Sequence, residues 1–443
     1  MPADTLAVWM DGYPAPAGRL IKADDGGISF RYEEAYIAAD RIGLSLALPL
    51  QEEAFNDIDT RAFFANLLPE NNQLQRVMER EGLELTDVVG LLRYLGADCP
   101  GAISCLPVDH PPVKAPGILE LDYEPIEERD LVRIVRSLAD TRRLPVEVRD
   151  PSPVAGVQSK IALTRLPDGR FALPRKGVKV PTTHILKVPE RRYGREARLE
   201  ESSALLAAAV GLPVSIPTAM SIDGIDALLI ERFDRHTEGG VVKRLHQEDF
   251  AQALGLPSEL KYQRKGKPGR RFDVDAAVWI LEQTVDPEQA RVDFLLATLF
   301  NLCIGNTDNH AKNHALLYAD GERPSFAPLY DLLPIRLDDR YTHELAYNLG
   351  EAAYFDDLTG EDIATFVAQC GVEDIGEFVD KLAVPMFELL EAATPNLRSQ
   401  GQKNFDDLIG REMGRLAQLL EASVAMRERD TFLTQGGGWG TGS

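Results

Sequence analysis

The feature that most constrains the fold is an apolar stretch in the C-terminal half of the chain, FLLATLFNLCIG, at residues 294–305. Its twelve residues are too few to cross a bilayer, because a spanning helix needs about 20 apolar residues. No run in the sequence approaches the roughly eighteen apolar residues of a membrane span. The stretch therefore predicts a helix that is buried in the core of a globular unit and ends near Gly305.

A polar cluster, GNTDNHAKN, follows this helix directly at residues 305–313. Asp308 and Asn313 stand five residues apart, and Asp331 follows 18 residues after Asn313. Protein kinases use this set: an Asp that orients the substrate hydroxyl, an Asn on Mg²⁺, and a second Asp that joins metal to phosphates. Carboxylate and amide oxygens are ligands that suit Mg²⁺. The pattern predicts a phosphoryl-transfer site in which the β-prone segment 314–331 returns the chain to place Asp331 beside Asn313.

Two other interpretations of the cluster stay open at this point. Asn306, Asp308 and Asn309 belong to the residue types that dominate turns and helix caps for local reasons. His310 and His314 have the i, i+4 spacing of metal ligands on a helix, but no third ligand is spaced to complete a zinc site. Further support for a kinase has to come from elsewhere in the chain.

That support comes from Lys187, a lone cation inside the buried-looking strand THILKVP at residues 183–189. An unpaired ammonium is costly to bury, so this residue requires an anion. A nucleotide phosphate would serve, and so would Glu200 or Glu201 on the following helix, as in the strand-Lys to helix-Glu pair of kinases. The alternative is an edge strand from which the lysine reaches solvent.

Two neighbouring segments carry weaker signals. SPVAGVQSKIAL, at residues 152–163, supplies Gly156 and Lys160 at the start of a hairpin, but one glycine is far from a phosphate-covering GxGxxG loop. ERFDR, at residues 231–235, stands where a kinase would place the hinge whose backbone binds adenine. Its charged side chains would by default form a solvated cluster with little effect on stability.

The order of patterns along the chain predicts an α+β protein. Residues 1–108 mix short β-prone runs with helical spacing, 109–235 form a linker and a strand-rich lobe, and 236–430 are mostly helical. We expect a hairpin closed at 167–169, an Ala/Leu-rich helix that Gly211 ends, a helix across 406–429, and a disordered tail at 431–443. A strand-rich lobe followed by a helical lobe would enclose a ligand cleft.

Charge and cysteine content narrow the class of function. The formal net charge of −22 argues against a surface that grips a nucleic-acid backbone by itself, and it suits a basic partner. The N-terminus lacks the basic start and long apolar stretch of a signal peptide, so we expect a cytoplasmic protein without membrane association. The four cysteines form no CxxC pair and are expected to be buried free thiols: Cys99, Cys105, Cys303 and Cys370.

Several motifs together give the chain a family resemblance. It carries, in this order, LSLALPL, FFANLLPE, GADCPGAI, VAGVQSK, PTTHILKVP, ERFDR, QEDFAQALGLPSELKY, GNTDNHAKN and PLYDLLP. With these motifs the chain resembles the HipA family of serine/threonine protein kinases, the toxin half of bacterial HipBA-type toxin–antitoxin modules. The Asp-x4-Asn core alone would also fit aminoglycoside-phosphotransferase-like small-molecule kinases, but those lack the N-terminal motifs and the QEDFAQALGLPS segment.

The resemblance implies a two-lobed protein-kinase-like fold, with a strand-rich N-lobe and a mostly helical C-lobe, preceded by a small α+β N-terminal subdomain. It implies ATP and Mg²⁺ as cofactors, Asp308 as the catalytic acceptor assisted by Lys312, and Asn313 and Asp331 as metal ligands. Glu200 matches the partner of Lys187 better than Glu201 does, by its distance from Gly211. The residues implied in nucleotide binding are Ala155, Gly156, Val157, Gln158, Ser159, Lys160, Lys187, Glu231, Arg232, Phe233, His310, Ala311, Lys312, Asn313, Tyr330 and Asp331.

The resemblance also implies partners. Family members phosphorylate aminoacyl-tRNA synthetases, notably glutamyl-tRNA synthetase, which stalls translation and favours dormancy and persistence. A HipB-like helix-turn-helix antitoxin restrains them and carries the toxin to operator DNA. The family's autophosphorylated serine stands two residues before the Ala-Gly pair, where this chain has Pro153. Ser152, one residue earlier, is the candidate replacement, although the proline biases it toward extended geometry. A catalytically silent co-repressor and a small-molecule kinase are the alternatives.

Overall fold

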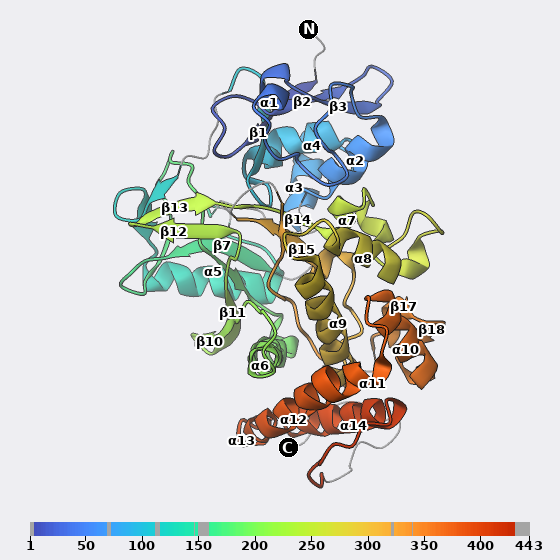
Figure 1. Ribbon diagram of the computed structural model, residues 1–443. Coiled ribbons are helices and arrows are strands. Elements are labelled where there is room, and N and C mark those ends of the chain that lie inside the picture. Colours follow the sequence, from blue (N-terminus) through green and yellow to red (C-terminus); the bar gives the residue numbers. More distant parts are fainter. Residues whose placement is uncertain are drawn as a thin grey trace. The chain divides into compact units, whose positions relative to one another are not determined.

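The computed structural model describes residues 4–68, 72–110, 116–145, 147–148, 159–319, 323–338 and 340–429. The chain divides into two compact units. The first unit comprises Met1–Ala197, Pro217–Ser258 and Ala315–Ser325, and the second comprises Arg198–Ile216, Glu259–His314 and Phe326–Ser443. Figure 1 labels the helices and strands of both.

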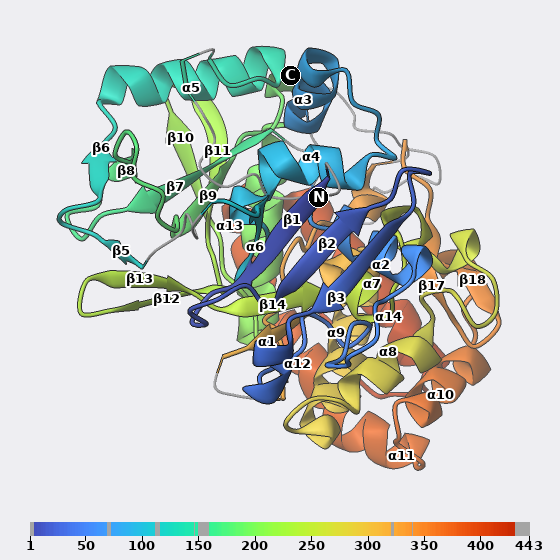
Figure 2. The same ribbon diagram turned by 90° about the horizontal axis from the view of Figure 1, so that it is seen from above.

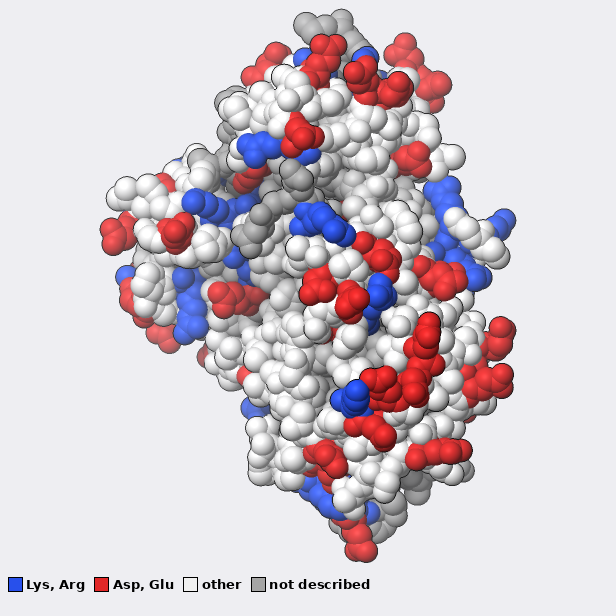
Figure 3. All heavy atoms as spheres, in the orientation of Figure 1, with Lys and Arg blue, Asp and Glu red and all other residues white. Residues whose placement is uncertain are grey.

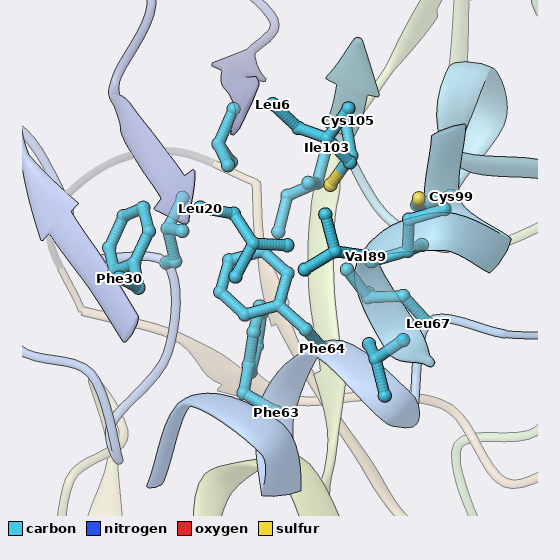
Figure 4. Close-up of a cluster of buried hydrophobic side chains, with 14 of the residues drawn as sticks. Leu6, Leu20, Phe30, Phe63, Phe64, Leu67, Val89, Cys99, Ile103 and Cys105 are labelled. Atoms are coloured by element: carbon cyan, nitrogen blue, oxygen red, sulfur yellow. The ribbon is translucent and has the colours of Figure 1, made fainter. Parts of the chain in front are cut away.

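The first unit opens with the predicted α+β subdomain. Its antiparallel sheet has the order β3-β2-β1-β4, with bounds Ile28–Tyr32, Gly18–Lys22, Thr5–Met10 and Ile103–Pro107. Figure 2 shows β1, β2 and β3 side by side. The helices are α1 (Glu34–Ala38), α2 (Asp57–Ala65), α3 (Asn72–Glu81) and α4 (Val88–Leu95). Strand and helix side chains such as Leu20, Phe30, Phe64 and Val89 form one buried core (Figure 4). Burial of this apolar surface is the main force that stabilises the subdomain.

A six-stranded sheet follows in the order β10-β11-β9-β7-β8-β6. Its strands are β10 (Thr218–Ile222), β11 (Ile225–Glu231), β9 (His184–Lys187), β7 (Lys160–Arg165), β8 (Phe171–Pro174) and β6 (Tyr123–Pro125). The predicted β7–β8 hairpin is confirmed, and it turns at Gly169, whose φ of 88° suits glycine. Helix α5 (Glu128–Thr141) packs Ile134, Val135 and Leu138 against the strands.

The first unit is completed by short strands and one helical turn. They are β5 (Gly117–Ile118), β12 (Arg235–Glu238), β13 (Val241–Arg244), β14 (His246–Asp249), α7 (Phe250–Ala253), β15 (Ala315–Tyr318) and β16 (Ser325–Phe326). Strand β5 lies inside the segment that was predicted as a linker, and it pairs with β13.

A buried carboxyl group joins the N-terminal subdomain to the β14–β15 pair. Glu248 on β14 is fully buried and accepts hydrogen bonds from Ser45 Oγ at 2.5 Å and Tyr318 Oη at 2.6 Å. Burial raises the pKa of Glu248 to about 7, because the charged form loses its hydration. The LSLALPL and QEDF motifs therefore meet in one polar contact.

The second unit is mostly helical. Its helices are α6 (Arg195–Ala209, whose first turn belongs to the first unit), α8 (Val274–Leu281), α9 (Pro287–Ile304), α10 (Gly360–Gln369), α11 (Ile375–Phe378), α12 (Val384–Ala393), α13 (Pro395–Ser399) and α14 (Lys403–Leu419). A hairpin of β17 (Glu344–Leu349) and β18 (Ala352–Tyr354) lies between α9 and α10 in sequence. The predicted core helix is confirmed as α9, which packs against α14.

Other predictions about elements have mixed outcomes. Helix α6 is confirmed, with Gly211 at a φ of 86° just beyond its end. The helix expected across 406–429 is too long, because α14 ends at Leu419 and Glu421 adopts a left-handed φ of 52°. All four cysteines are buried free thiols, as predicted. Within the described ranges no helix is long and apolar enough to traverse a bilayer, and the tail 431–443 lies outside those ranges.

Candidate active site

The loop that carries Asp308 is anchored at the C-terminal end of α9. Helix α9 ends at Gly305, whose φ of 71° is left-handed, and the Gly305 carbonyl accepts the backbone N–H of Arg336 at 2.9 Å. Asn306 bonds back to Asn301 twice, through its backbone N–H and through its side-chain amide, each at 2.8 Å. The polar cluster is thus a rigid extension of a buried helix, which is the support that a catalytic loop requires.

Asp308 is the carboxylate of this loop, and hydrogen bonds hold both its side chain and its backbone. Its Oδ1 accepts a hydrogen bond from Tyr262 Oη at 2.6 Å, and its backbone carbonyl accepts one from Asn313 Nδ2 at 2.8 Å. Burial raises the pKa of Asp308, and the nearby charge of Asp331 raises it further, whereas the Tyr262 bond lowers it. The second carboxylate oxygen, Oδ2, has no hydrogen bond within the described chain. Asp308 and Asp331 are close enough to interact electrostatically.

Asn313 and Asp331 offer a donor set that fits Mg²⁺. Asn313 ends the short 3-10 turn Ala311–Asn313 and is buried; because its nitrogen is committed to the Asp308 carbonyl, its oxygen is the atom available to a cation. Asp331 is exposed. One amide oxygen and one carboxylate suit Mg²⁺, which retains waters and takes further oxygens from substrate phosphates.

Asp331 is held by the segment that precedes it. Leu329 pairs with Val214 in a parallel bridge; its N–H donates to the Pro213 carbonyl and its carbonyl accepts the Ser215 N–H, both at 2.9 Å. Tyr330 Oη donates to the backbone carbonyl of Lys312 at 2.8 Å. The Leu329 bonds hold PLYD against residues 213–215, and the Tyr330 bond ties it to the Asp308 loop. Asp331 itself has a left-handed φ of 58°, a conformation that carries strain for most side chains and is common at functional sites.

The two histidines of the cluster have different surroundings. His310 packs its ring edge-on against Tyr262, with ring centroids 5.1 Å apart. His314 is buried among Phe272, Phe294 and Phe326, and burial lowers its pKa to about 3. His314 is therefore a neutral core residue, and the i, i+4 spacing does not bring the two rings to a shared ligand.

In the first unit, Lys187 lies on a central strand rather than an edge strand, so the alternative of an edge lysine is wrong. Strand β9 lies between β11 and β7, and Lys187 is 8% exposed. In the β7–β9 pair it stands directly opposite Lys160. Directly paired residues of antiparallel strands share a face, and like charges there repel. The two ammonium groups therefore concentrate positive charge on one face of the sheet, as a phosphate site requires.

The hinge segment corrects a prediction, because three of its four charged side chains are buried, whereas Glu231 is exposed as expected. Arg232 donates to both carboxylate oxygens of Asp234 at 2.9 and 2.8 Å, and Arg235 donates to Asp234 at 2.8 Å. The side chains of Arg232, Asp234 and Arg235 are 4%, 8% and 2% exposed. Since the Arg232 guanidinium is committed to Asp234, contacts of Glu231–Phe233 with a nucleotide would use backbone groups.

This cluster gives a stability prediction. Replacing Asp234 with Asn should lower the free energy of unfolding by about 3–5 kcal/mol, because two buried guanidinium groups lose their counter-charge. Asp223→Asn is the matched control, since it breaks an exposed pair with Arg136 and should cost less than about 1 kcal/mol. Urea unfolding of both variants measures the difference. Equal losses of unfolding free energy in the two variants would show that the buried ion pairs stabilise the fold no more than the exposed pair does.

Some predicted site residues are not tested by the geometry. Ser152, Ala155, Gly156, Val157 and Gln158 lie outside the described residues. Ser159 and Lys160 are described, and the Ser159 carbonyl accepts the Val188 N–H at 2.8 Å. Glu200 is buried on α6, with 4% exposure. Its pairing with Lys187 stays a prediction.

Sequence reasoning missed Tyr262. The residue ends the QEDFAQALGLPSELKY motif, 46 positions before the Asp308 that its hydroxyl contacts. The neighbouring Lys261 carbonyl accepts the Ala311 N–H at 3.1 Å, so the two segments run side by side. A tyrosine in a helical-looking motif carries no signal of such a long-range contact.

The parts described so far are those of a protein-kinase-like protein: a sheet with a buried lysine, and a helical unit with an Asp-x4-Asn loop followed by a second Asp. Comparisons with known proteins narrow this class. The family model of the HipA N-terminal domain matches residues 6–106, and that of the HipA-like C-terminal domain matches residues 152–387. The chain belongs to the HipA family of serine/threonine protein kinases.

Individual relatives agree with this assignment. Y4mE of Sinorhizobium fredii, whose name describes a kinase, is 35% identical over 88% of this chain and 93% of its own length. The serine/threonine-protein kinase toxin HipA of Shewanella oneidensis is 29% identical over 70% of this chain and 71% of its own length. The structure of HipA from the Shewanella oneidensis MR-1 HipA, HipB and operator DNA complex has a TM-score of 0.77 at 23% identity, covering 94% of this chain and 98% of that one. That likeness shows the fold.

Proposed function

We propose that this protein is an ATP- and Mg²⁺-dependent serine/threonine kinase that acts as the toxin of a toxin–antitoxin module. The observation that carries the proposal is the arrangement of Asp308, with one carboxylate oxygen held by Tyr262 and the backbone fixed by Asn313. A carboxylate fixed in this way has one oxygen left to orient a hydroxyl group. Catalysis of phosphoryl transfer consists mainly of such positioning and of charge stabilisation.

In the proposed reaction, the oxygen of a substrate Ser or Thr hydroxyl attacks the γ-phosphorus of ATP, and the bond from that phosphorus to the β–γ bridging oxygen breaks. The hydroxyl proton passes to Asp308 Oδ2, and ADP leaves. Mg²⁺, held by Asn313 and Asp331, would neutralise charge on the phosphates. Lys160 and Lys187 would bind phosphate oxygens, and Lys312 would stabilise charge on the transferred group.

The proposed biological role follows from the family. A partner resembling HipB would bind this chain and bring it to operator DNA, as in the complex of the Shewanella proteins. The net charge of −22 favours association with a basic partner. The proposed target is an aminoacyl-tRNA synthetase, with glutamyl-tRNA synthetase as the first to test. Phosphorylation of such an enzyme would inhibit growth and favour persistence.

A transfer assay tests the activity. Purified protein is incubated with radiolabelled ATP, Mg²⁺ and purified glutamyl-tRNA synthetase or a bacterial lysate. The proposal expects labelled phosphoserine or phosphothreonine in a protein band. Label that reaches only a small molecule would favour a small-molecule kinase, and nucleotide binding without any transfer would favour a silent co-repressor.

Tyr262→Phe tests how Asp308 is positioned. The variant removes the hydroxyl that holds Oδ1, and hydrogen bonds to charged groups are worth enough to predict a loss in kcat of about tenfold or more. Because the hydroxyl lowers the pKa of Asp308, its removal should raise that pKa. The acidic limb of the pH profile of kcat should therefore shift to higher pH.

Tyr341→Phe, at an exposed tyrosine, is the control for this variant. It should leave both the rate and the pH profile unchanged. A Tyr262→Phe enzyme with the wild-type pH profile would show that the hydroxyl does not act on Asp308.

A further inference from the structure

A strongly basic loop follows Tyr262 and is not used by the proposed chemistry. The segment KYQRKGKPGRR, residues 261–271, has six Lys or Arg among eleven residues in a chain of net charge −22. In Figure 3, Lys and Arg side chains gather where Figure 1 draws the loop that precedes α8. A local concentration of one charge in a chain of the opposite sign requires its own explanation.

The loop is ordered by its own backbone. Residues 267–270 form a tight turn in which the N–H of Arg270 donates to the Lys267 carbonyl at 2.8 Å. Pro268 and Gly269 stand at its two central positions, and Gly269 has a φ of 79°. This is the chemistry of a type II turn, which Pro and Gly pre-set. The basic side chains are therefore presented by a defined turn.

The base of the loop is fixed to the candidate active site. Tyr262 donates to Asp308, and the Lys261 carbonyl accepts the Ala311 N–H. The Arg264 guanidinium lies 4.2 Å from the centre of the Tyr262 ring and pairs with Glu344 at 3.2 Å. Glu344 belongs to β17, and a second bond ties the loop to the same strand: Gln263 Oε1 accepts the Asn348 N–H at 2.8 Å. A ligand on the turn would thus be held at a defined position relative to Asp308.

Three of the six cations in the loop have partners of their own. Lys261 lies over the Tyr262 ring, with Nζ 5.6 Å from the ring centroid, and Arg264 and Arg271 pair with Glu344 and Asp273. Lys265, Lys267 and Arg270 are exposed and form no ion pair with any described residue. Since a rigid turn already fixes their backbone, a bound anion would have to order little more than the side chains.

We propose that the three exposed cations of the loop, Lys267 and Arg270 at the ends of the turn and Lys265 just before it, dock acidic residues that flank the phosphorylated Ser or Thr of the protein substrate. The inference rests on the proposed kinase function. The base of the loop contacts Asp308 through Tyr262, so the loop adjoins the place where the acceptor hydroxyl would bind. Carboxylates close to that hydroxyl are the substrate groups whose charge complements these cations. An RNA backbone is disfavoured as the occupant, because a chain of net charge −22 repels a dense row of phosphates. The turn therefore selects among protein substrates by their local charge.

The test uses the full-length protein and a set of Ser/Thr peptides of equal length with acidic, neutral or basic flanks. Wild-type protein should show a KM about tenfold lower for acidic than for neutral flanks, since three exposed ion pairs of modest strength are involved. The preference should weaken as salt is added. The triple variant Lys265→Gln/Lys267→Gln/Arg270→Gln should lose the preference through KM, with kcat unchanged.

Two further variants make the test specific. Arg129→Gln/Lys243→Gln/Lys381→Gln removes the same charge from three exposed sites on separate elements and should keep the preference. Lys265→Glu/Lys267→Glu/Arg270→Glu should reverse the preference toward basic flanks. Equal KM values for all flanks in an active wild-type protein would overturn the inference.

Other outcomes separate this inference from the proposed function. Absence of transfer to every peptide and to every protein in a lysate would count against the kinase itself, and the docking inference would fall with it. RNA is tested by fluorescence anisotropy with a single-stranded oligonucleotide at about 0.15 M salt, near the physiological ionic strength. If the glutamine variant loses RNA binding while its peptide preference stays as in wild type, the turn binds RNA and the proposal is wrong.

Discussion

Asp308→Asn is expected to lower kcat for phosphoryl transfer by about 10³-fold, because a positioned general base contributes 10²- to 10⁴-fold to a rate. Asn keeps the size of the side chain and can still accept the Tyr262 hydrogen bond through its oxygen, so the loop should keep its geometry. It cannot take up the hydroxyl proton. The measurement is kcat at saturating ATP, with a protein or peptide substrate that the wild-type enzyme phosphorylates.

The same variant has an expected effect on stability that runs opposite to its effect on rate. Because the folded-state pKa of Asp308 is raised, the folded protein binds this proton more tightly than the unfolded chain. The stabilising contribution is present at low pH and is lost as pH rises from the ordinary Asp pKa through the raised one. At neutral pH the uncharged Asn should therefore be at least as stable as Asp.

Asp293→Asn is the matched control for Asp308→Asn. Asp293 is a partly buried aspartate of α9 whose pKa is also raised by burial, but it lies outside the candidate site. It should show the wild-type rate. A full rate in Asp308→Asn, with a folded protein, would contradict the assignment of Asp308.

Asp331→Asn is expected to raise the Mg²⁺ concentration needed for half-maximal activity by about 100-fold, since it removes the carboxylate of the proposed metal site. Asn tolerates the left-handed backbone that Asp331 adopts, so the change is one of charge rather than of conformation. Loss of the neighbouring charge should also lower the pKa of Asp308. The measurement is a Mg²⁺ titration of the transfer rate at fixed ATP.

Asp338→Asn is the control for the metal prediction. Asp338 lies seven residues further along and pairs with Arg340, so it changes the same charge without touching the proposed metal ligands. Its Mg²⁺ titration should match that of wild type. If Asp331→Asn has the wild-type Mg²⁺ dependence, the metal is held by other groups.

Local patterns were enough to predict many elements of the fold. The strand around Lys187, the β7–β8 turn at Gly169 and the end of α6 before Gly211 follow from residue types whose effects reach only a few positions. Helix α9 was predictable for a similar reason, because an apolar run that is too short to span a bilayer is expected to be buried in a protein core. The spacing of Asp308, Asn313 and Asp331 predicted one site because the kinase arrangement is recognisable along the sequence.

Features that depend on tertiary contacts were not predictable in this way. The Arg232, Asp234 and Arg235 cluster is charged in sequence yet buried in the fold. Its ion pairs are local, but Arg235 also donates to the Thr182 carbonyl, 53 positions away, and the sequence gives no sign of that contact. The contact of Tyr262 with Asp308 joins segments far apart in sequence. The end of α14 was overestimated, since the helical spacing continues beyond Leu419 although Glu421 turns left-handed.

If Asp308 directs phosphoryl transfer to Ser or Thr residues of cellular proteins, the modified sites should depend on this one carboxylate. Phosphoproteomics after brief induction, comparing wild type with Asp308→Asn at equal protein levels, measures this dependence. We expect a small set of new phosphoserine or phosphothreonine sites in wild type, with an aminoacyl-tRNA synthetase among the modified proteins, and none of these sites in the variant. Identical phosphoproteomes for the two proteins, or sites that persist in Asp308→Asn, would contradict it.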